Sequence, residues 1–504
     1  MNTSTELLVG KDIQWCTIEQ VISFLDTSHR PSLRLVSKDF DEFIMGLFTK
    51  IILCQTTEDL PHLFKNCQSL VYLEVNGISK PLDVSRICQV LEDGILPNLL
   101  TLDFQYSRIT DRNIVHLFHT LETGCCPHLN TIRLSNNAMG VAGASAMASC
   151  LSLGVLNEIK EIDLNHNLIF AGGIKKISRA FMNFHSRNLE DVNISRCHLA
   201  NPGIRFFCES MNGCPLITLR SLRLYWNSIN SGGIKHLALS ISLGILDSLE
   251  VLDISKNPIG WKGIERLTES VMRGNHLPHL KVLMMHSCKL RTKGMRWTGI
   301  MIRFLREIEV LSIGSEELEW TIKYADNNIK AKGMSYLVEG MRRESFFLPR
   351  LRILDLTNNK IKQEGIGYLV EMIQNNNFPN LEELSLISND IRDEGLLKLI
   401  AMMRYGFLPH LKTIYLSDNK LRDESVKQLT AALAARKLAA NAELYLGCNK
   451  LSSGVVQSLV SLLYLRPESQ DPPLKYVVLE KKRKEIPERL IQNALANPTA
   501  FSVC

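Results

Sequence analysis

The chain has 504 residues, of which 45% are hydrophobic and 22% charged, and its mean hydropathy is +0.01. A chain of this length exceeds a single compact core, so several domains or an extended array are expected. The formal net charge is only +6 and the charged residues of both signs are interspersed, which argues against a dedicated nucleic-acid or membrane surface.

The sequence also lacks the usual signs of export. It has no run of about 18 uncharged apolar residues, and residues 1–15 lack the basic and apolar regions of a signal peptide. The thirteen cysteines are scattered without paired spacing, as reduced cysteines of a cytosolic protein are. Cys125 and Cys126 are adjacent, but no second pair completes a zinc site. We expect a cytoplasmic protein, with nuclear entry left open, and no cofactor or metal.

The first predicted elements are short helices within residues 13–44. Val21, Ile22, Phe24 and Leu25 share one helical face, residues 26–31 interrupt it, and two further helical segments reach residue 44. On the residues alone this is a small helical domain over residues 1–45 that caps whatever follows.

Two stretches of this segment, "VISFLD" (21–26) and "LRLVSKDF" (33–40), resemble the F-box motif. The resemblance implies an adaptor of the Skp family as partner. Ile13 and Gln14 stand where the family has Leu-Pro. The adaptor-binding residues implied by the resemblance are Ile13, Ile22, Phe24, Leu25, Leu33, Leu35, Val36 and Phe40. An unrelated helical cap is the alternative.

From residue 46 to 473 the chain repeats itself about every 30 residues. The recurring pattern L-x-x-L-x-L-x-x-N-x-I is clearest in "LRSLRLYWNSI" (219–229) and "LRILDLTNNKI" (351–361). The alternating leucines predict a short strand with one buried face, and strands of neighbouring repeats would pair in parallel. At the asparagine position, a side-chain amide can satisfy backbone groups of the turn. Cysteine takes this position at 197 and 288.

A glycine and an amphipathic helix follow each strand, as in "GIKHLALSI" (233–241). We expect the glycine to relieve the turn into the helix. A periodic strand–turn–helix unit predicts a solenoid, and the pattern resembles ribonuclease-inhibitor-like leucine-rich repeats. The resemblance implies an α/β fold, a right-handed horseshoe with parallel strands on the concave face and helices on the convex face.

One copy is longer than the others. Residues 308–351 contain an insertion of 11 residues near 314–324, because Ile313 and Tyr324 compete for the same place in the pattern. Such an insertion is either a tolerated loop or part of a binding face. The last segment, 474–504, is expected to cap the array; its basic run at 481–484 fits a solvated edge better than a nuclear signal.

Alternation along the strands predicts which side chains face a partner. Aromatic and arginine side chains there would anchor a protein, with stacking on neighbouring repeats as the alternative. The predicted partner-binding residues are Tyr106, Arg133, His166, Arg196, Arg223, Tyr225, Trp226, Lys256 and His286.

No nucleotide-binding, metalloprotease or serine-hydrolase motif is present, so we expect no catalysis. The F-box resemblance together with the repeats implies a substrate-recognition subunit of a Skp–cullin–F-box ubiquitin ligase, with adaptor and cullin as partners and an unidentified protein on the concave face. No nucleic acid or membrane is implied. The alternative is a scaffold, or a GTPase-regulator-like binding protein, without a ubiquitin role.

Overall fold

The computed structural model divides the chain into two compact units, Met1–Asn227 (unit 1) and Ser228–Cys504 (unit 2), which are treated separately. The residues that the structure describes are 6–9, 33–34, 50–53, 64, 67–75, 84–182, 188–214, 216–315, 327–342, 347–435, 442–464 and 474–479.

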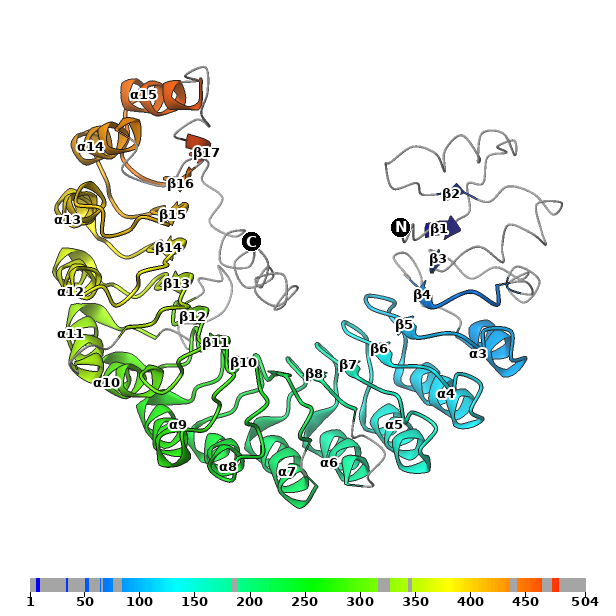
Figure 1. Cartoon of the computed structure of the whole chain (residues 1–504). Coiled ribbons are helices and arrows are strands. Elements are labelled where there is room, and N and C mark those ends of the chain that lie inside the picture. The colour runs from blue at the N-terminus through cyan, green and yellow to red at the C-terminus, as the bar shows by residue number, and fades with distance from the viewer. Residues whose placement is uncertain are drawn as a thin grey trace. The chain divides into compact units, whose positions relative to one another are not determined.

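In unit 1, parallel strands form one layer and helices the other (Figure 1). The strands are β1 (Glu6–Val9), β2 (Leu33–Arg34), β3 (Lys50–Leu53), β4 (Tyr72–Val75), β5 (Thr101–Asp103), β6 (Thr131–Arg133), β7 (Glu161–Asp163), β8 (Asp191–Asn193) and β9 (Ser221–Arg223). The helices are α3 (Ser85–Glu92), α4 (Asp111–Glu122), α5 (Val141–Leu153), α6 (Phe170–Phe181) and α7 (Ala200–Gly213). From β3 to β9 each strand pairs with the next along the chain.

Unit 2 repeats this plan. Its strands are β10 (Val251–Asp253), β11 (Val282–Met284), β12 (Val310–Ser312), β13 (Ile353–Asp355), β14 (Glu383–Ser385), β15 (Thr413–Tyr415), β16 (Ala442–Tyr445) and β17 (Leu474–Val478). Its helices are α8 (Ser231–Ser242), α9 (Gly260–Gly274), α10 (Arg291–Ile302), α11 (Lys330–Met341), α12 (Lys362–Gln374), α13 (Arg392–Arg404), α14 (Asp423–Ala434) and α15 (Ser453–Tyr464). The α/β leucine-rich repeat solenoid predicted from the sequence is confirmed.

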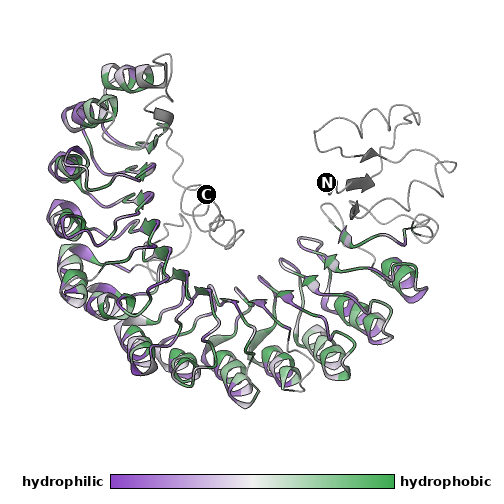
Figure 2. Ribbon diagram, viewed as in Figure 1, coloured by the Kyte–Doolittle hydropathy of each residue, from purple (hydrophilic) through white to green (hydrophobic). Residues whose placement is uncertain are grey.

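The core of each unit lies between the two layers. The middle residue of each three-residue strand, such as Leu222, points to the helices and is buried, as is the apolar residue two positions later, such as Leu224. Helices contribute their apolar stripes, so that hydrophobic and hydrophilic colours alternate around them in Figure 2. Burying these stripes is the main stabilising contribution to the fold.

The asparagine position joins each repeat to the one before it. Asn227 Nδ2 donates to the carbonyl oxygens of Ile194 (2.7 Å) and Leu224 (3.1 Å), and its Oδ1 accepts from the N–H of Cys197 (2.9 Å). Where the position holds Cys197, Sγ donates to the carbonyl of Leu164 at 3.0 Å. Cysteine can therefore replace the donor half of the asparagine.

The repeat glycines have a different role from the one predicted. Gly263 lies inside the first turn of α9, and its φ is not in the left-handed region. A Cβ there would lie 2.1 Å from Ile259 Cγ2 and 3.0 Å from Ile234 Cγ2. The glycine is therefore required by close packing between the helix, its own turn and the preceding helix, and not by the turn's dihedral angles.

The N-terminal region differs from the prediction where the structure describes it. Leu33, expected in a helix, lies in strand β2, because Leu33 and Arg34 pair with Leu7 and Leu8 of β1. Strand β1 pairs with β3, and β3 pairs with β4. Residues before 70 therefore extend the sheet, although they carry no repeat pattern. The rest of the F-box-like segment lies outside the described residues.

The hydrogen bonds of Asn327 locate the insertion. Asn327 Nδ2 donates to the carbonyl of Ile313, 14 positions earlier, whereas Asn227 bonds a carbonyl only 3 positions earlier, a difference of 11 residues. Gly314 and Ser315 occupy regular turn positions, and the backbone N–H of Asn327 donates to Ser315 Oγ. The extra residues are therefore 316–326, which lie outside the described residues.

Among the helices in the described ranges, none has the length and apolar character needed to cross a bilayer. Within the same ranges, no group of three or more His, Cys, Asp or Glu side chains is placed to hold a metal ion.

Candidate protein-binding site

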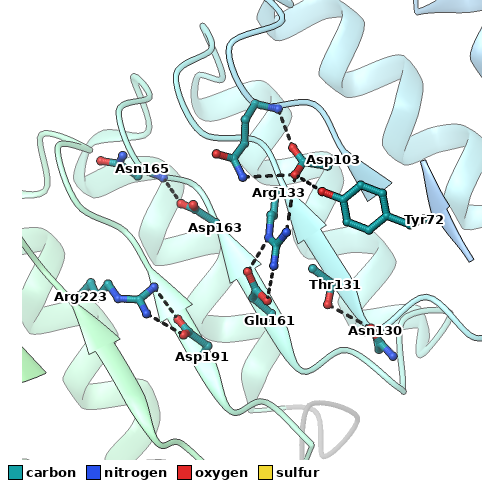
Figure 3. Close-up of polar contacts among 11 residues, drawn as sticks. Tyr72, Asp103, Asn130, Thr131, Arg133, Glu161, Asp163, Asn165, Asp191 and Arg223 are labelled. Atoms are coloured by element: carbon teal, nitrogen blue, oxygen red, sulfur yellow. Dashed lines mark hydrogen bonds and ion pairs between the residues drawn. The ribbon is translucent and has the colours of Figure 1, made fainter. Parts of the chain in front are cut away.

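The outward side of the sheet in unit 1 carries a chain of paired charges, the polar strand face, which consists of Tyr72, Asp103, Arg133, Glu161, Asp163, Asp191 and Arg223 (Figure 3). Strand alternation puts them there, because the residues between them, such as Ile132 and Ile162, point into the core. Parallel register then sets neighbours side by side, for example Arg133 and Asp163.

Arg133 is the centre of this face. Its Nε and Nη2 donate to the two carboxylate oxygens of Glu161 at 2.7 and 3.0 Å, and Nη1 lies 3.7 Å from Asp103 Oδ2. Tyr72 Oη donates to the same Asp103 oxygen at 3.0 Å. The hydrogen bond to Glu161 raises the pKa of Arg133, and burial together with Asp103 raises that of Tyr72. Bidentate pairing of this kind fixes the guanidinium plane.

Arg223 makes a second pair. Its Nη1 donates to Asp191 Oδ1 at 3.3 Å, and Nη2 lies 3.1 Å from Oδ2. Arg133 and Arg223, two of the three arginines that were predicted to bind a partner, are thus engaged by carboxylates of a neighbouring repeat. Their side chains nevertheless stay accessible, with exposed fractions of 30% for Arg133 and 16% for Arg223. A partner that contacts either guanidinium group therefore also meets the carboxylate that is paired with it.

Asp163 lies between the two pairs. Its Oδ1 accepts the backbone N–H of Asn165 at 2.9 Å, and Asp103 accepts that of Gln105 in the same way. Burial raises the pKa of Asp163 to about 6, against the lowering effect of the N–H bond and of Arg223. Asp163 therefore titrates close to neutral pH.

We expect Asp163→Asn to stabilise the protein at pH 7.5. The folded-state pKa of Asp163 is above its unfolded value, so the stability that belongs to the protonated form is present below pH 4 and is lost as the pH rises through about 6. The amide retains the acceptor for Asn165 without the charge, a gain of about 1–2 kcal/mol in the free energy of unfolding after solvent screening. The thermal unfolding midpoint measures it.

The gain in midpoint should shrink toward pH 4, where the carboxyl group is neutral. Equal gains at pH 4 and pH 7.5 would contradict the raised pKa of Asp163.

A second group of side chains lies at the turn edge, where strands end. Arg196 stacks over the rings of Tyr225 and Trp226, with its Cζ 5.2 and 4.9 Å from the ring centroids. The two rings meet edge to face at 6.1 Å, and Arg196 Nη2 donates to Tyr225 Oη at 3.4 Å. Each partner is thereby held in place while Trp226 keeps 37% of its surface exposed.

The strand prediction was wrong in one respect at these positions. Tyr106, Arg196 and Trp226 are not strand residues, because each follows the end of its strand by three positions and adopts a left-handed φ of 55°, 51° and 51°. Their backbone N–H groups continue the ladder, as Arg196 N–H does to the carbonyl of Tyr225 at 2.7 Å. The side chains therefore project from the turn edge and not from the sheet.

The other predicted residues divide between exposed and buried positions. Tyr106 is 61% exposed, and His166, also exposed, approaches Asn136 Oδ1 at 2.7 Å through Nδ1. Partial burial, Arg196 and His198 lower the pKa of His166. In unit 2, Lys256 and His286 are only 9% and 2% exposed, which contrasts with the expected partner contact. Ile13, Ile22, Phe24, Leu25, Leu35, Val36 and Phe40 lie outside the described residues.

Sequence reasoning missed Tyr72, Glu161 and Asp191 as members of the site. Each is an unremarkable polar residue in its own repeat, and only the register between strands shows that it pairs with the next one. The available signal was spacing, because Arg133 and Glu161 are 28 positions apart and so fall on adjacent strands.

We expect Arg196→Ala with Trp226→Ala to weaken partner capture and to change stability by less than about 1 kcal/mol, since exposed cation–π contacts are worth about that much. Alanine suffers no more than tryptophan from the φ of 51° at position 226. Thermal unfolding and partner pull-down measure the two effects. A stability loss as large as that of a core substitution would show that the two residues hold the fold together.

Comparison with known proteins agrees with the repeats. A family model described as "Leucine Rich repeat" matches residues 125–148, 185–208, 247–267, 349–370, 379–399 and 407–429. Each match contains one strand and its asparagine position, which in 185–208 is Cys197.

Two solved structures were compared as well. An internalin (inlF) from Listeria monocytogenes shows 14% identity over 83% of this chain and 83% of its own, with a TM-score of 0.37. The plant peptide hormone receptor RGFR1 in complex with RGF2 shows 13% identity over 89% of this chain and 69% of its own, with a TM-score of 0.33. From its repeating strand–turn–helix units and the six matched segments, the chain contains leucine-rich repeats and has their α/β solenoid fold.

Proposed function

We propose that this protein is the substrate-recognition subunit of a Skp–cullin–F-box ubiquitin ligase in the cytoplasm or nucleus. The segment 1–45 binds the adaptor, and the polar strand face with the turn edge of unit 1 binds the substrate. The protein itself makes no covalent bond. It raises the effective concentration of substrate lysines near a ubiquitin-charged enzyme.

The observation that carries the binding role is the accessible polar strand face. Side chains there are held in fixed geometry by partners from adjacent repeats, and Arg133, Glu161 and Asp191 keep exposed fractions of 30%, 29% and 26%. Charged groups that are already oriented lose little entropy when a partner binds, so they favour specific recognition.

The face favours a basic substrate segment. On the outward positions of β4 to β9, five carboxylates oppose two guanidinium groups: Glu74, Asp103, Glu161, Asp163 and Asp191 against Arg133 and Arg223. The exposed rings of Tyr106 and Trp226 at the turn edge add apolar contact area for the same segment.

The adaptor role is supported by the residues of the F-box-like segment and is tested by affinity purification with mass spectrometry. The full chain should retain a Skp-family adaptor and a cullin. Full-length Val36→Asp with Phe40→Ala should lose both, and Ser28→Ala, in the interruption between the two matched stretches, should keep both.

If the unchanged chain retains no adaptor under conditions in which an established F-box protein does, the ligase role fails and a scaffold remains. The substrate surface is tested separately with the Arg196→Ala and Trp226→Ala chain. That chain should keep the adaptor and lose other captured proteins.

A further inference from the structure

The outward side of the sheet in unit 2 is apolar and buried, in contrast to unit 1. Val251, Val282, Val310 and Ile353 lie side by side on β10 to β13 and are exposed by 4% or less. These side chains belong to one hydrophobic cluster, whose members are Val251, Val282, Met284, Val310, Ile353, Ile387, Tyr415 and Tyr445. We call this cluster the apolar strand face.

The helices do not account for this burial. Helices α8 to α15 pack on the opposite side of the sheet (Figure 1). Tyr415 and Tyr445 stack on one another with centroids 4.4 Å apart, but each is only 4% exposed on a face that no described helix of the unit covers. In unit 1 the corresponding outward residues of β7 and β8 stay partly exposed. A contiguous apolar surface of this kind on the outward side of a sheet calls for a partner that covers it.

The chain itself offers a suitable segment. After β17, the last strand of the unit 2 sheet, residues 480–504 remain, and they lie outside the described residues. After Glu480, their sequence has the basic run "KKRK" (481–484), then Glu485 and "IPERLIQNALAN" (486–497). Ile486, Leu490, Ile491, Ala494 and Leu495 recur at helical spacing, and Arg489 and Gln492 fall on the opposite side.

The charges of the segment and of the sheet are complementary. The basic run starts three residues after β17, and the outward carboxylates nearest that end of the sheet are Glu443 on β16 and Glu383 on β14. Burial and the nearby Glu443 and Glu382 raise the pKa of Glu383. Cations placed over these two glutamates would relieve their repulsion.

The length is sufficient as well. From β17 to β10 is seven strand spacings of about 4.8 Å, or roughly 34 Å. Seven extended residues span about 23 Å and a twelve-residue helix about 18 Å, which together reach the far valines.

We propose that residues 480–504 dock in cis on the apolar strand face, with the basic run against Glu383 and Glu443 and the apolar residues 486–495 against Val251, Val282, Val310 and Ile353. The segment occupies this face of unit 2 as an internal ligand. The inference does not depend on the ubiquitin role.

The test is competition by a labelled peptide of residues 480–504, followed by fluorescence anisotropy on full-length protein. Leu490→Asp with Ile491→Asp in the protein should release the attached segment, so that the unchanged peptide binds this variant at least about tenfold tighter than it binds the original chain. Gln492→Asp with Ala496→Asp adds the same charge on the side of the segment opposite its apolar residues. This control chain should behave like the original.

Two further measurements keep the result decisive. Adding Glu383→Lys with Glu443→Lys to the released variant should weaken peptide binding and reduce its salt dependence. Circular dichroism confirms that each variant is folded. Equal peptide affinity for the original and released chains would overturn the proposal.

The two other possible covers are separated in the same experiments. If the original chain sediments as a dimer and Met284→Glu makes it a monomer, a second copy covers the face. If the peptide binds only after residues 316–326 are replaced by a glycine–serine linker, the insertion is the cover. Either outcome overturns the proposal.

Discussion

Asn327→Ala is expected to lower the free energy of unfolding by about 3 kcal/mol or more, since each buried backbone group left without a partner costs about 1–3 kcal/mol. The Asn327 side chain donates to the carbonyls of Met285 (2.8 Å) and Ile313 (3.0 Å) and accepts from the N–H of Cys288 (2.8 Å) and Leu290 (3.1 Å). All of these groups are buried. Thermal and urea unfolding of the full chain measure the loss.

Two further variants serve as controls for the loss of these hydrogen bonds. Asn327→Cys should lose less than Asn327→Ala, because Cys288 in the same position of its repeat donates Sγ to the carbonyl of Ile254 at 3.2 Å. Asn157→Ala, at an exposed position, should change stability by less than about 0.5 kcal/mol. If Asn327→Ala lowered the free energy of unfolding no more than Asn157→Ala, the asparagine position would not stabilise the contact between repeats.

Gly340→Ala is expected to destabilise by about 2 kcal/mol, within the range for overpacked cores. A Cβ on Gly340 would lie 2.4 Å from the carbonyl oxygen of Arg296 and 3.1 Å from the Cα of Gly299. Both atoms are backbone of α10, so α10 and α11 would have to separate. The cost exceeds the gain in helix propensity, and thermal unfolding measures the difference.

The same substitution in the next helix should have the opposite sign. Gly367 lies in α12 with nothing within 4 Å of an added Cβ, so Gly367→Ala should stabilise by up to about 1 kcal/mol. If both substitutions stabilised the protein, the close contact of α10 with α11 would be wrong.

The repeat period revealed the architecture because each apolar position is fixed by burial. Leu222, Leu224 and Asn227 have the roles that their spacing predicts, and the helix after them, α8, covers the expected stretch 233–241 and begins two residues before it. Because burial requires an apolar residue at the same position of every repeat, the pattern can be recognised in a single sequence. Strands β1 and β3 were not predicted, because their short apolar stretches carry no asparagine or glycine to mark a repeat.

The binding site was harder to predict, because it depends on contacts between repeats. The position of Trp226 in its repeat could be predicted. The left-handed backbone conformation that sets the direction of its side chain could not, because alternation along a strand does not predict it. The partners of Arg133 come from two different strands, and the pattern of one repeat does not specify them. The burial of Val282 on the outward side likewise depends on what covers the sheet, which periodicity does not report.

The asparagine position also bears on how this protein can change in length over generations. Such a side chain bonds its own repeat and the repeat before it, as Asn389 does to the carbonyl of Leu356 and Asn419 to that of Leu386. Loss of residues 381–410 would set Asn419 next to the repeat of Asn359 with every bond type preserved. Loss of a whole repeat therefore preserves the series of bonds, and added residues preserve it where they fall between the strand and the asparagine position, as residues 316–326 do before Asn327.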